Sequence, residues 1–339
     1  MRRVSAQSLI WALAILLPVA ALVSMTVGTV NISLADTLSA VVGNSVSQQT
    51  DTILFDIRLP RILLAIFVGA VLASTGAVMQ GLFRNPLADP SLIGVSSGAS
   101  VGASLMIVTA GGFIQSGALV GLSLVAVGAF VGGFAATLLV YRLATSGIGT
   151  SVTTMLLAGI AIGALAGALN SLLSYFSDND MLRQISLWQM GNLSGASWLK
   201  VSIMGAVTIF LMLLFPRESK ALNALLLGES EARHLGIDVQ RVKRRLIILT
   251  ALGVGVSVAL AGLVGFVGLI MPHIVRLAIG PDHRWLVPGS ALAGATLLVI
   301  ADSLARIVVI PAELPTGILT ALLGAPFFVA LLLKQRKDV

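Results

Sequence analysis

The chain has 339 residues, of which 57% are hydrophobic and only 10% are charged, with a net charge of +7 and no cysteine. A soluble domain carries about 25% charged residues, so this composition excludes an aqueous globular fold and predicts a protein whose solvent is lipid. The missing cysteines exclude disulfides and thiolate sites, and in a membrane protein the positive charge indicates basic cytoplasmic loops rather than nucleic-acid binding.

The apolar segments are continuous rather than alternating, which favours helices over a β-barrel. A helix that crosses a bilayer needs about 20 apolar residues. We expect the first helix in residues 4–35, the second in 62–83, the third and fourth in 90–141 with a break at Gly111-Gly112, the fifth in 143–177 and the sixth in 201–215. A charged loop over about 216–245 comes next, and the last apolar segments are 246–275, 285–301 and 314–333.

Segment 246–275 is long enough for one helix or for two short ones, so the chain has nine or ten spans. Ten spans place both termini on one side, together with 16 of the 21 Lys and Arg residues. The other side keeps Arg58, Arg61, Arg183, Lys200 and Arg306. Because basic loops stay in the cytoplasm, we predict an all-α integral membrane protein. It has ten transmembrane helices, both termini cytoplasmic, and a single domain over residues 1–339.

Glycines recur at every fourth position in two of the predicted helices. Gly94, Gly98 and Gly102 lie in the third span, and Gly159, Gly163 and Gly167 lie in the fifth. This spacing places small residues on one helix face and lets backbones approach closely. The rows predict tight packing, and they are also compatible with a face that borders a conduit.

Two segments break the helical pattern on the predicted cytoplasmic side. Asp89 suits an N-cap and Pro90 the first position of the third helix. In the long loop, Glu229 and Glu231 favour a helix start and Gly236 favours a stop. We therefore predict a short helix in this loop, which is either a solvated connector or a docking element for a cytoplasmic motor.

Signals for chemistry on this chain are nearly absent. The three histidines, His234, His273 and His283, are not spaced with carboxylates as a metal site needs. The dipeptide Gly-Lys never occurs, so the phosphate-binding loop that ends in Gly-Lys-Ser/Thr is missing. We predict no catalytic residue, no metal site and no cofactor bound by this chain.

Charged residues are also missing from the middle of the predicted spans. Asp302, Arg306 and Glu313 are the only charges around the ninth and tenth spans, and they lie near a helix end. Ion-coupled carriers usually keep such residues near mid-membrane. This pattern argues against a secondary carrier and predicts that the energy source is on another chain.

Several stretches resemble the permease subunits of bacterial importers for iron-siderophores, haem and cobalamin. They are Asp56-Ile57-Arg58-Leu59-Pro60-Arg61, Gly76-Ala77-Val78-Met79-Gln80, residues 85–90 and 92–99, Leu227-Gly228-Glu229, Leu235-Gly236, Gly265-Phe266-Val267-Gly268-Leu269, Pro272-His273 and Glu313-Leu314-Pro315-Thr316-Gly317. These stretches follow nearly the whole chain in order. Within the family, residues 85–94 and 178–183, with Trp188 and Gly191, look most like haem permeases.

The resemblance implies a homodimer in the bacterial inner membrane with a central translocation pathway. Two cytoplasmic ABC ATPase subunits would bind ATP and Mg below it, and a periplasmic substrate-binding protein would deliver the cargo above. The expected function is import of haem, or a related iron chelate, by alternating access. Alternatives are a ferric-siderophore or cobalamin permease of the same family, a secondary carrier for a metal chelate, and a membrane scaffold or receptor.

The resemblance also implies roles for individual residues. The helix over 151–176 would line the pore, with Met155, Gly159, Gly163, Gly167 and Asn170 along it. The cytoplasmic gate would include Asn85, Leu87, Thr153 and Thr154. The ATPase would dock on Gly228, Glu229, Ser230, Leu235 and Gly236. The binding protein would meet Arg58, Arg61 and Arg306. Because no histidine is expected at mid-depth, cargo would pass without iron ligation.

Overall fold

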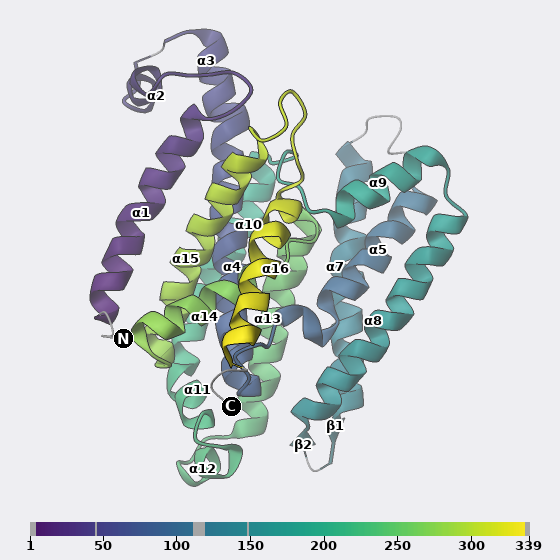
Figure 1. Cartoon of the computed structure of the whole chain (residues 1–339). Helices are drawn as coiled ribbons and strands as arrows, with labels where there is room; N and C mark the ends of the chain where they lie inside the picture. The colour runs from purple at the N-terminus through teal and green to yellow at the C-terminus, as the bar shows by residue number, and fades with distance from the viewer. Residues whose placement is uncertain (1–4, 45, 111–118, 148, 336–339) are drawn as a thin grey trace. The chain divides into compact units, whose positions relative to one another are not determined.

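The computed structural model describes residues 5–44, 46–110, 119–147 and 149–335, whose regular structure is almost entirely helical (Figure 1). The α-helices are α1 (Ala6–Thr26), α2 (Leu34–Val41), α3 (Gln48–Thr52), α4 (Leu59–Phe83), α5 (Val95–Thr109), α7 (Leu119–Ala144), α8 (Val152–Tyr175), α9 (Asn179–Gln189), α10 (Trp198–Leu214), α11 (Ser219–Leu225), α12 (Glu229–His234), α13 (Val239–Ala261), α14 (Val267–Ile279), α15 (His283–Ala305) and α16 (Thr316–Gln335). A π-helix (Ile53–Arg58) and two 3-10 turns (Pro90–Ile93 and Phe215–Glu218) join some of them. Strands β1 (Thr145–Ser146) and β2 (Gly149–Thr150) form an antiparallel hairpin, the only sheet among these residues.

Many of the helices begin at a serine or aspartate whose side chain accepts a hydrogen bond from the first turn. A helix leaves its first backbone N–H groups without partners, and these side chains satisfy one of them. The capping residues are Ser5, Ser33, Ser47, Ser151, Asp178, Ser197, Asp238 and Asp282 for α1, α2, α3, α8, α9, α10, α13 and α15. The helix starts are therefore encoded locally.

The expected number of membrane-crossing helices agrees with the structure. In the described part of the chain, seven helices are long and apolar enough to cross a membrane, and three shorter apolar helices accompany them. Segment 246–275 forms two helices, since α13 ends at Ala261 and α14 begins at Val267. The break expected at Gly111-Gly112 lies outside the described residues.

Contacts divide the chain into two compact units, although the sequence predicts a single domain. Unit 1 comprises residues 1–77, 192–216 and 264–339, and unit 2 comprises 78–191 and 217–263. In unit 1, α15 packs against α1, α14 and α16. Helix α1 begins and α16 ends at the same end of this unit (Figure 1), as expected if both termini lie on one side of the membrane.

Unit 2 is built around the close pair α5 and α7, with α8 and α13 packed against them. Gly98 and Gly102 of α5 lie against Gly132 and Gly128 of α7, where an added Cβ would overlap a backbone carbonyl oxygen. The glycine row of α5 therefore packs helix to helix, as its spacing predicts.

The start of the third span differs from the expectation in one respect. Asp89 caps the turn and Pro90 is its first residue, but this turn is a 3-10 helix that ends at Ile93. Gly94 follows with φ +82° and lies outside α5. Glycine adopts this left-handed backbone without steric cost, so Gly94 makes a corner instead of belonging to the packed row.

Candidate functional site

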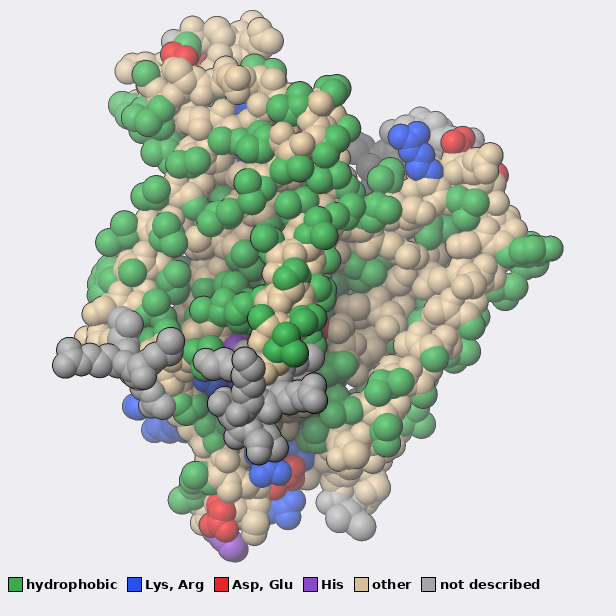
Figure 2. Space-filling view, viewed as in Figure 1, with side chains coloured by type: hydrophobic (Ala, Val, Ile, Leu, Met, Phe, Trp, Pro, Cys, Tyr) green, Lys and Arg blue, Asp and Glu red, His purple; other side chains and the backbone are tan. Residues whose placement is uncertain are grey.

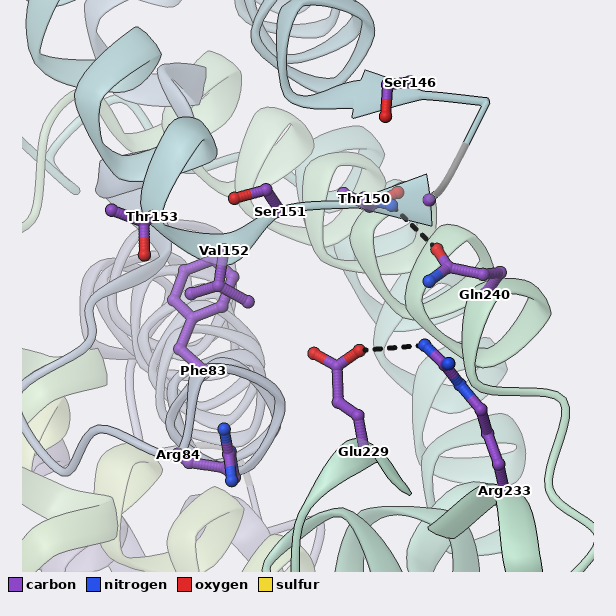
Figure 3. A pocket seen from close by; sticks show the side chains of 11 residues that line it. Phe83, Arg84, Ser146, Thr150, Ser151, Val152, Thr153, Glu229, Arg233 and Gln240 are labelled. Carbon is purple, nitrogen blue, oxygen red and sulfur yellow. Dashed lines mark hydrogen bonds and ion pairs between the residues drawn. The ribbon is translucent and has the colours of Figure 1, made fainter. Parts of the chain in front are cut away.

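A pocket of about 570 Å³ opens at one end of unit 2 (Figure 3). Four elements meet there: the end of α4, the β1–β2 hairpin with the start of α8, helix α12, and the start of α13. The lining residues are Phe83, Arg84, Ser146, Gly149, Thr150, Ser151, Val152, Thr153, Glu229, Arg233 and Gln240. The pocket thus brings together segments to which sequence reasoning assigned a gate, a pore helix and a docking helix.

The charges around this pocket are partly paired. Glu229 Oε2 lies 3.7 Å from Arg233 Nη2 within α12, and Glu229 Oε1 lies 2.6 Å from Lys243 Nζ of α13. Figure 3 shows Arg84 on the opposite side of the pocket from Arg233. Arg84 adopts φ +48°, which is uncommon for a residue with a side chain. The pocket wall therefore carries more basic than acidic groups and presents several hydroxyl groups.

Asn85 and Leu87, the residues predicted to form the gate, lie in the turn that leaves α4 beside this pocket. The Asn85 side chain accepts a hydrogen bond from the Leu87 backbone N–H at 2.9 Å, and both residues are half-buried. Asp89 closes the turn by accepting the Ser91 N–H at 2.8 Å. Burial raises the pKa of the Asp89 carboxyl, because desolvation disfavours its charged form. The turn is held by its own side chains.

The two threonines that were also predicted for the gate lie in the first turn of α8. Both are exposed, and Thr153 lines the pocket. The Thr154 hydroxyl donates to the Ser151 hydroxyl at 3.0 Å. The structure therefore places Thr153 at the pocket that Phe83 and Arg84, the residues just before Asn85, also line.

The residues predicted along the pore lie in contrasting surroundings on α8. Met155 and Gly159 are buried, and a Cβ on Gly159 would overlap the Leu92 carbonyl oxygen. Asn170 donates to the Ser100 hydroxyl at 3.1 Å. A Cβ on Gly163 would only touch the Ser97 hydroxyl at 3.5 Å, and a Cβ on Gly167 would meet nothing within 4 Å. Tight packing is thus confirmed for Gly159 but not for Gly163 and Gly167.

The predicted short helix in the long loop is present as α12. It begins after Gly228 at φ +123° and ends before Gly236 at φ +80°. Leu235 is 64% exposed, and Ser230 is exposed as well. Figure 2 shows acidic, basic and histidine side chains gathered on the tip that α12 forms. The predicted docking residues therefore share a charged, accessible surface.

The three arginines predicted to dock a partner are buried in unit 1. Arg58, Arg61 and Arg306 are 5%, 5% and 3% exposed. Arg61 Nε lies 2.9 Å from Asp302 Oδ2, and its Nη1 lies 2.6 Å from Glu313 Oε2. Internal carboxylates and carbonyls therefore already bind these side chains, and the docking role that the sequence suggests for them stays a prediction.

The other two arginines extend this buried cluster. Arg306 lies 3.4 Å from Asp302 and donates to the Val27 carbonyl at 2.9 Å. Arg58 donates to the carbonyls of Met25 and Val30. The cluster therefore ties the segment after α1 to the ends of α4 and α15. A buried charge needs such partners because leaving water is costly.

The histidines contribute no metal centre in the part of the chain that the structure describes. No group of three or more His, Asp or Glu side chains lies together there as a metal site would require. His273 is buried half-way along α14, and α14 lies near the end of unit 1 where α1 begins (Figure 1). Its ring meets the Phe327 ring edge-on, with centroids 6.4 Å apart.

Sequence reasoning missed the residues that hold the pocket together. Lys243 is 1% exposed and donates to the Thr150 carbonyl at 2.8 Å, and Gln240 accepts from the Thr150 N–H at 2.9 Å. In the sequence Lys243 is one of four basic residues between Arg241 and Arg245. Such a cluster reads as a solvated cytoplasmic loop, and nothing in it distinguishes the one buried member.

Comparison with known proteins defines the class of this one. Residues 16–334 match the FecCD transport family. The hemin transport system permease protein of Yersinia pestis is 44% identical over 336 residues, covering 99% of this chain and 98% of that protein. The vitamin B12 import system permease protein of Shigella boydii serotype 18 is 42% identical over 338 residues, with coverage of 99% and 98%.

A solved structure agrees with these sequence matches. It is described as an inward-facing conformation of a metal-chelate type ABC transporter, and it matches with a TM-score of 0.85 and 34% identity over 97% of this chain and 99% of its own. The fold and these matches define a multi-span membrane permease of the ABC transporter class. The chain belongs to the FecCD transport family.

Proposed function

We propose that this chain is the membrane-spanning subunit of an importer that moves haem from the periplasm to the cytoplasm. The observation that carries the proposal is the 44% identity to a hemin permease over 99% of the chain. The resemblance of residues 85–94 to haem permeases supports the same cargo. The protein would lie in the bacterial inner membrane, with the α12 end of unit 2 facing the cytoplasm.

The energy for transport would come from separate subunits. Two cytoplasmic ATPases would bind ATP and Mg and dock on α12, and this chain would need no cofactor of its own. The exposed Leu235 and the charged surface of α12 suit such a contact. A symmetric pair of ATPases needs two docking helices, and each chain offers one, so we propose a homodimer.

The pathway would run along α8 of both copies. Apolar side chains cover much of this helix, and Leu157, Ile160 and Leu165 are 63%, 65% and 56% exposed in the single chain. A conduit without strong ligands releases its cargo readily. The gate would lie beside the pocket in unit 2, at Asn85, Leu87, Thr153 and Thr154.

A periplasmic binding protein would deliver the cargo on the other side of the membrane from the ATPases. A docking role for Arg58, Arg61 and Arg306 requires their guanidinium groups to leave the carboxylates and carbonyls that they bind here. We therefore assign these arginines first to holding their end of unit 1 together. If the binding protein docks through these arginines, its own groups would have to replace the internal carboxylates and carbonyls as their partners.

A second cargo has specific support. The vitamin B12 permease is nearly as similar, at 42% identity over 99% of the chain. The test is uptake into vesicles that contain the permease, its ATPase and its binding protein, comparing haemin, a ferric siderophore and cyanocobalamin. ATP-dependent uptake of haemin alone is expected. Uptake of cyanocobalamin or the siderophore but not of haemin would show that haem is not the cargo. If none of the three compounds is taken up in an ATP-dependent manner, the proposed import function is wrong.

A further inference from the structure

Lys243 is a buried cation that joins three separate segments of unit 2. It lies near the start of α13 and is 1% exposed. Its Nζ donates to the Thr150 carbonyl at 2.8 Å and to Glu229 Oε1 at 2.6 Å. A buried ammonium group that loses a partner becomes strongly destabilising. Both partners are therefore held to Lys243.

Thr150 is held at both of its backbone polar groups by one helix. Gln240 accepts from the Thr150 N–H at 2.9 Å, while Lys243 donates to the carbonyl of the same residue. Figure 3 shows this hydrogen bond between Gln240 and Thr150, both of which line the pocket. Ser151, the next residue, is the N-cap of α8. The start of α8 is thus positioned by the first turns of α13.

Glu229 connects the same lysine to the docking helix. It is the first residue of α12, directly after Gly228. Its other ionic contact, with Arg233, is longer at 3.7 Å and involves an Arg side chain that is 57% exposed. Exposed pairs of this kind contribute little. The short bond to Lys243 is therefore the stronger restraint on the start of α12.

We propose that Lys243 is a positioning residue that transmits a displacement of α12 to the start of α8. This inference rests on the proposed function, in which α12 receives the ATPase and α8 lines the pathway. When α12 moves, Glu229 carries the buried ammonium with it because separation would leave the charge without its carboxylate. The ammonium in turn carries the Thr150 carbonyl and the N-cap of α8.

The key variant is Lys243→Met, which removes the charge and both hydrogen bonds while keeping an unbranched chain. It is expected to fold, because the carboxylate left behind is not buried: Glu229 is 30% exposed and keeps Arg233 and solvent as partners, so no buried charge is left unpaired. Glu229→Gln is a milder variant that removes only the carboxylate charge. Arg241→Met is the matched control, since Arg241 lies on the same helix and pairs with Asp238 while 68% exposed.

The first measurement is haemin moved per ATP hydrolysed in vesicles that contain the complete complex. In the Lys243→Met complex, the ATPase should still bind and hydrolyse ATP, and haemin moved per ATP should fall about ten-fold, as expected when a hydrogen bond to a charged group is lost. Glu229→Gln should cause a smaller loss, and Arg241→Met none. A merely structural role would lower the amount of folded complex without changing this ratio. An unchanged ratio in Lys243→Met, or an equal loss in Arg241→Met, would overturn the proposal.

The second measurement tests the link without requiring transport. The chain has no cysteine, so spin labels can be placed through His234→Cys on α12 and Leu157→Cys on α8, both exposed positions. The distance distribution in the permease alone should be narrow, should broaden with Lys243→Met and should stay narrow with Arg241→Met. If the wild-type complex moves no haemin, the proposed function fails, and these distances still decide whether Lys243 couples the two helices. An unchanged distribution in Lys243→Met would refute the coupling.

Discussion

At the scale of single residues, the buried ion pair of Arg61 and Asp302 supports a first prediction. Arg61→Met removes a guanidinium that binds both Asp302 and Glu313. Asp302 would keep Arg306 and the Thr316 hydroxyl, which donates at 2.9 Å. Breaking a buried pair from one side costs about 3 kcal/mol or more. The free energy of unfolding in detergent should fall by about this amount, as followed by denaturant titration.

Arg284→Met is the control for Arg61. Arg284 pairs with Asp282 at 2.7 Å, yet its side chain is 68% exposed. Water screens such a pair, so its removal should leave the midpoint of unfolding almost unchanged. Equal losses in the two variants would show that burial does not decide the strength of these pairs.

The Asp89 carboxyl carries a prediction about pH. Because burial raises its folded-state pKa, protonated Asp89 favours the native state at low pH, and this contribution is lost as the pH rises through the folded pKa. Asn caps a helix as well as Asp does and does not ionise. The difference in thermal stability between Asp89→Asn and wild type should therefore shift in favour of the variant as the pH rises from 4 to 7.5. Asp89→Ala does not ionise either but loses the cap, so it should be less stable than Asp89→Asn by about 1 kcal/mol at both pH values; a constant wild-type-to-Asn difference would argue against a raised pKa.

At the scale of helices, two glycines of similar sequence context should behave in opposite ways. A Cβ on Gly102 would overlap the Gly128 carbonyl oxygen, whereas a Cβ on Gly167 would meet nothing within 4 Å. Gly102→Ala should therefore destabilise the protein by about 1–3 kcal/mol through overpacking. Gly167→Ala should keep or raise the stability by up to about 1 kcal/mol, because alanine is the better helix former. Thermal unfolding of the two purified variants measures the difference.

Helix α12 carries a prediction about docking. Leu235 is 64% exposed at its end, so Leu235→Asp should leave the permease folded. A buried charge in the contact should weaken ATPase binding roughly thirty-fold or more, as at other interface hot spots. The control is Val42→Asp, because Val42 is 77% exposed after α2 in unit 1. Titration of the ATPase onto both variants compares them, and wild-type affinity in Leu235→Asp would disprove this docking surface.

At the scale of the whole molecule, the proposed homodimer predicts that two copies of the gate turn approach each other. Asn85→Cys or Leu87→Cys is a clean probe because the chain contains no other cysteine. An oxidant should crosslink two copies in at least one nucleotide state and block uptake. A reducing agent should then restore uptake in the same vesicles. Absence of the crosslink in every nucleotide state would place the gate elsewhere.

The sequence predicted features that depend on neighbouring residues. The ten apolar helices that could cross a membrane follow from apolar runs in the sequence. Helix α12 follows from Glu229, Glu231 and Gly236, whose preferences act within one or two helical turns. The packing of Gly98 and Gly102 follows from their spacing alone. Gly94 shows the limit, because its place in the row suggested a helix while its φ of +82° makes it a corner.

The expected functional residues were only partly located by the sequence. The resemblance to haem and cobalamin permeases indicated the gate turn and α12, and the structure places their neighbours around one pocket. The resemblance also implied that a binding protein meets Arg58, Arg61 and Arg306, and the structure shows that these side chains are buried. The sequence and the resemblance show that a basic residue is present at a given position. Whether its side chain is buried depends on the elements that pack around it.

Hydropathy, capping and glycine spacing are local properties, so the sequence by itself determined the membrane class and the helices of this protein, and the resemblance of its motifs indicated the family. Which charged side chains are paired was decided only by the tertiary structure. Arg61 meets Asp302 across 241 positions, and Lys243 meets Thr150 across 93. These pairs form because folding removes the side chains from water and leaves each charge dependent on the groups that packing brings to it.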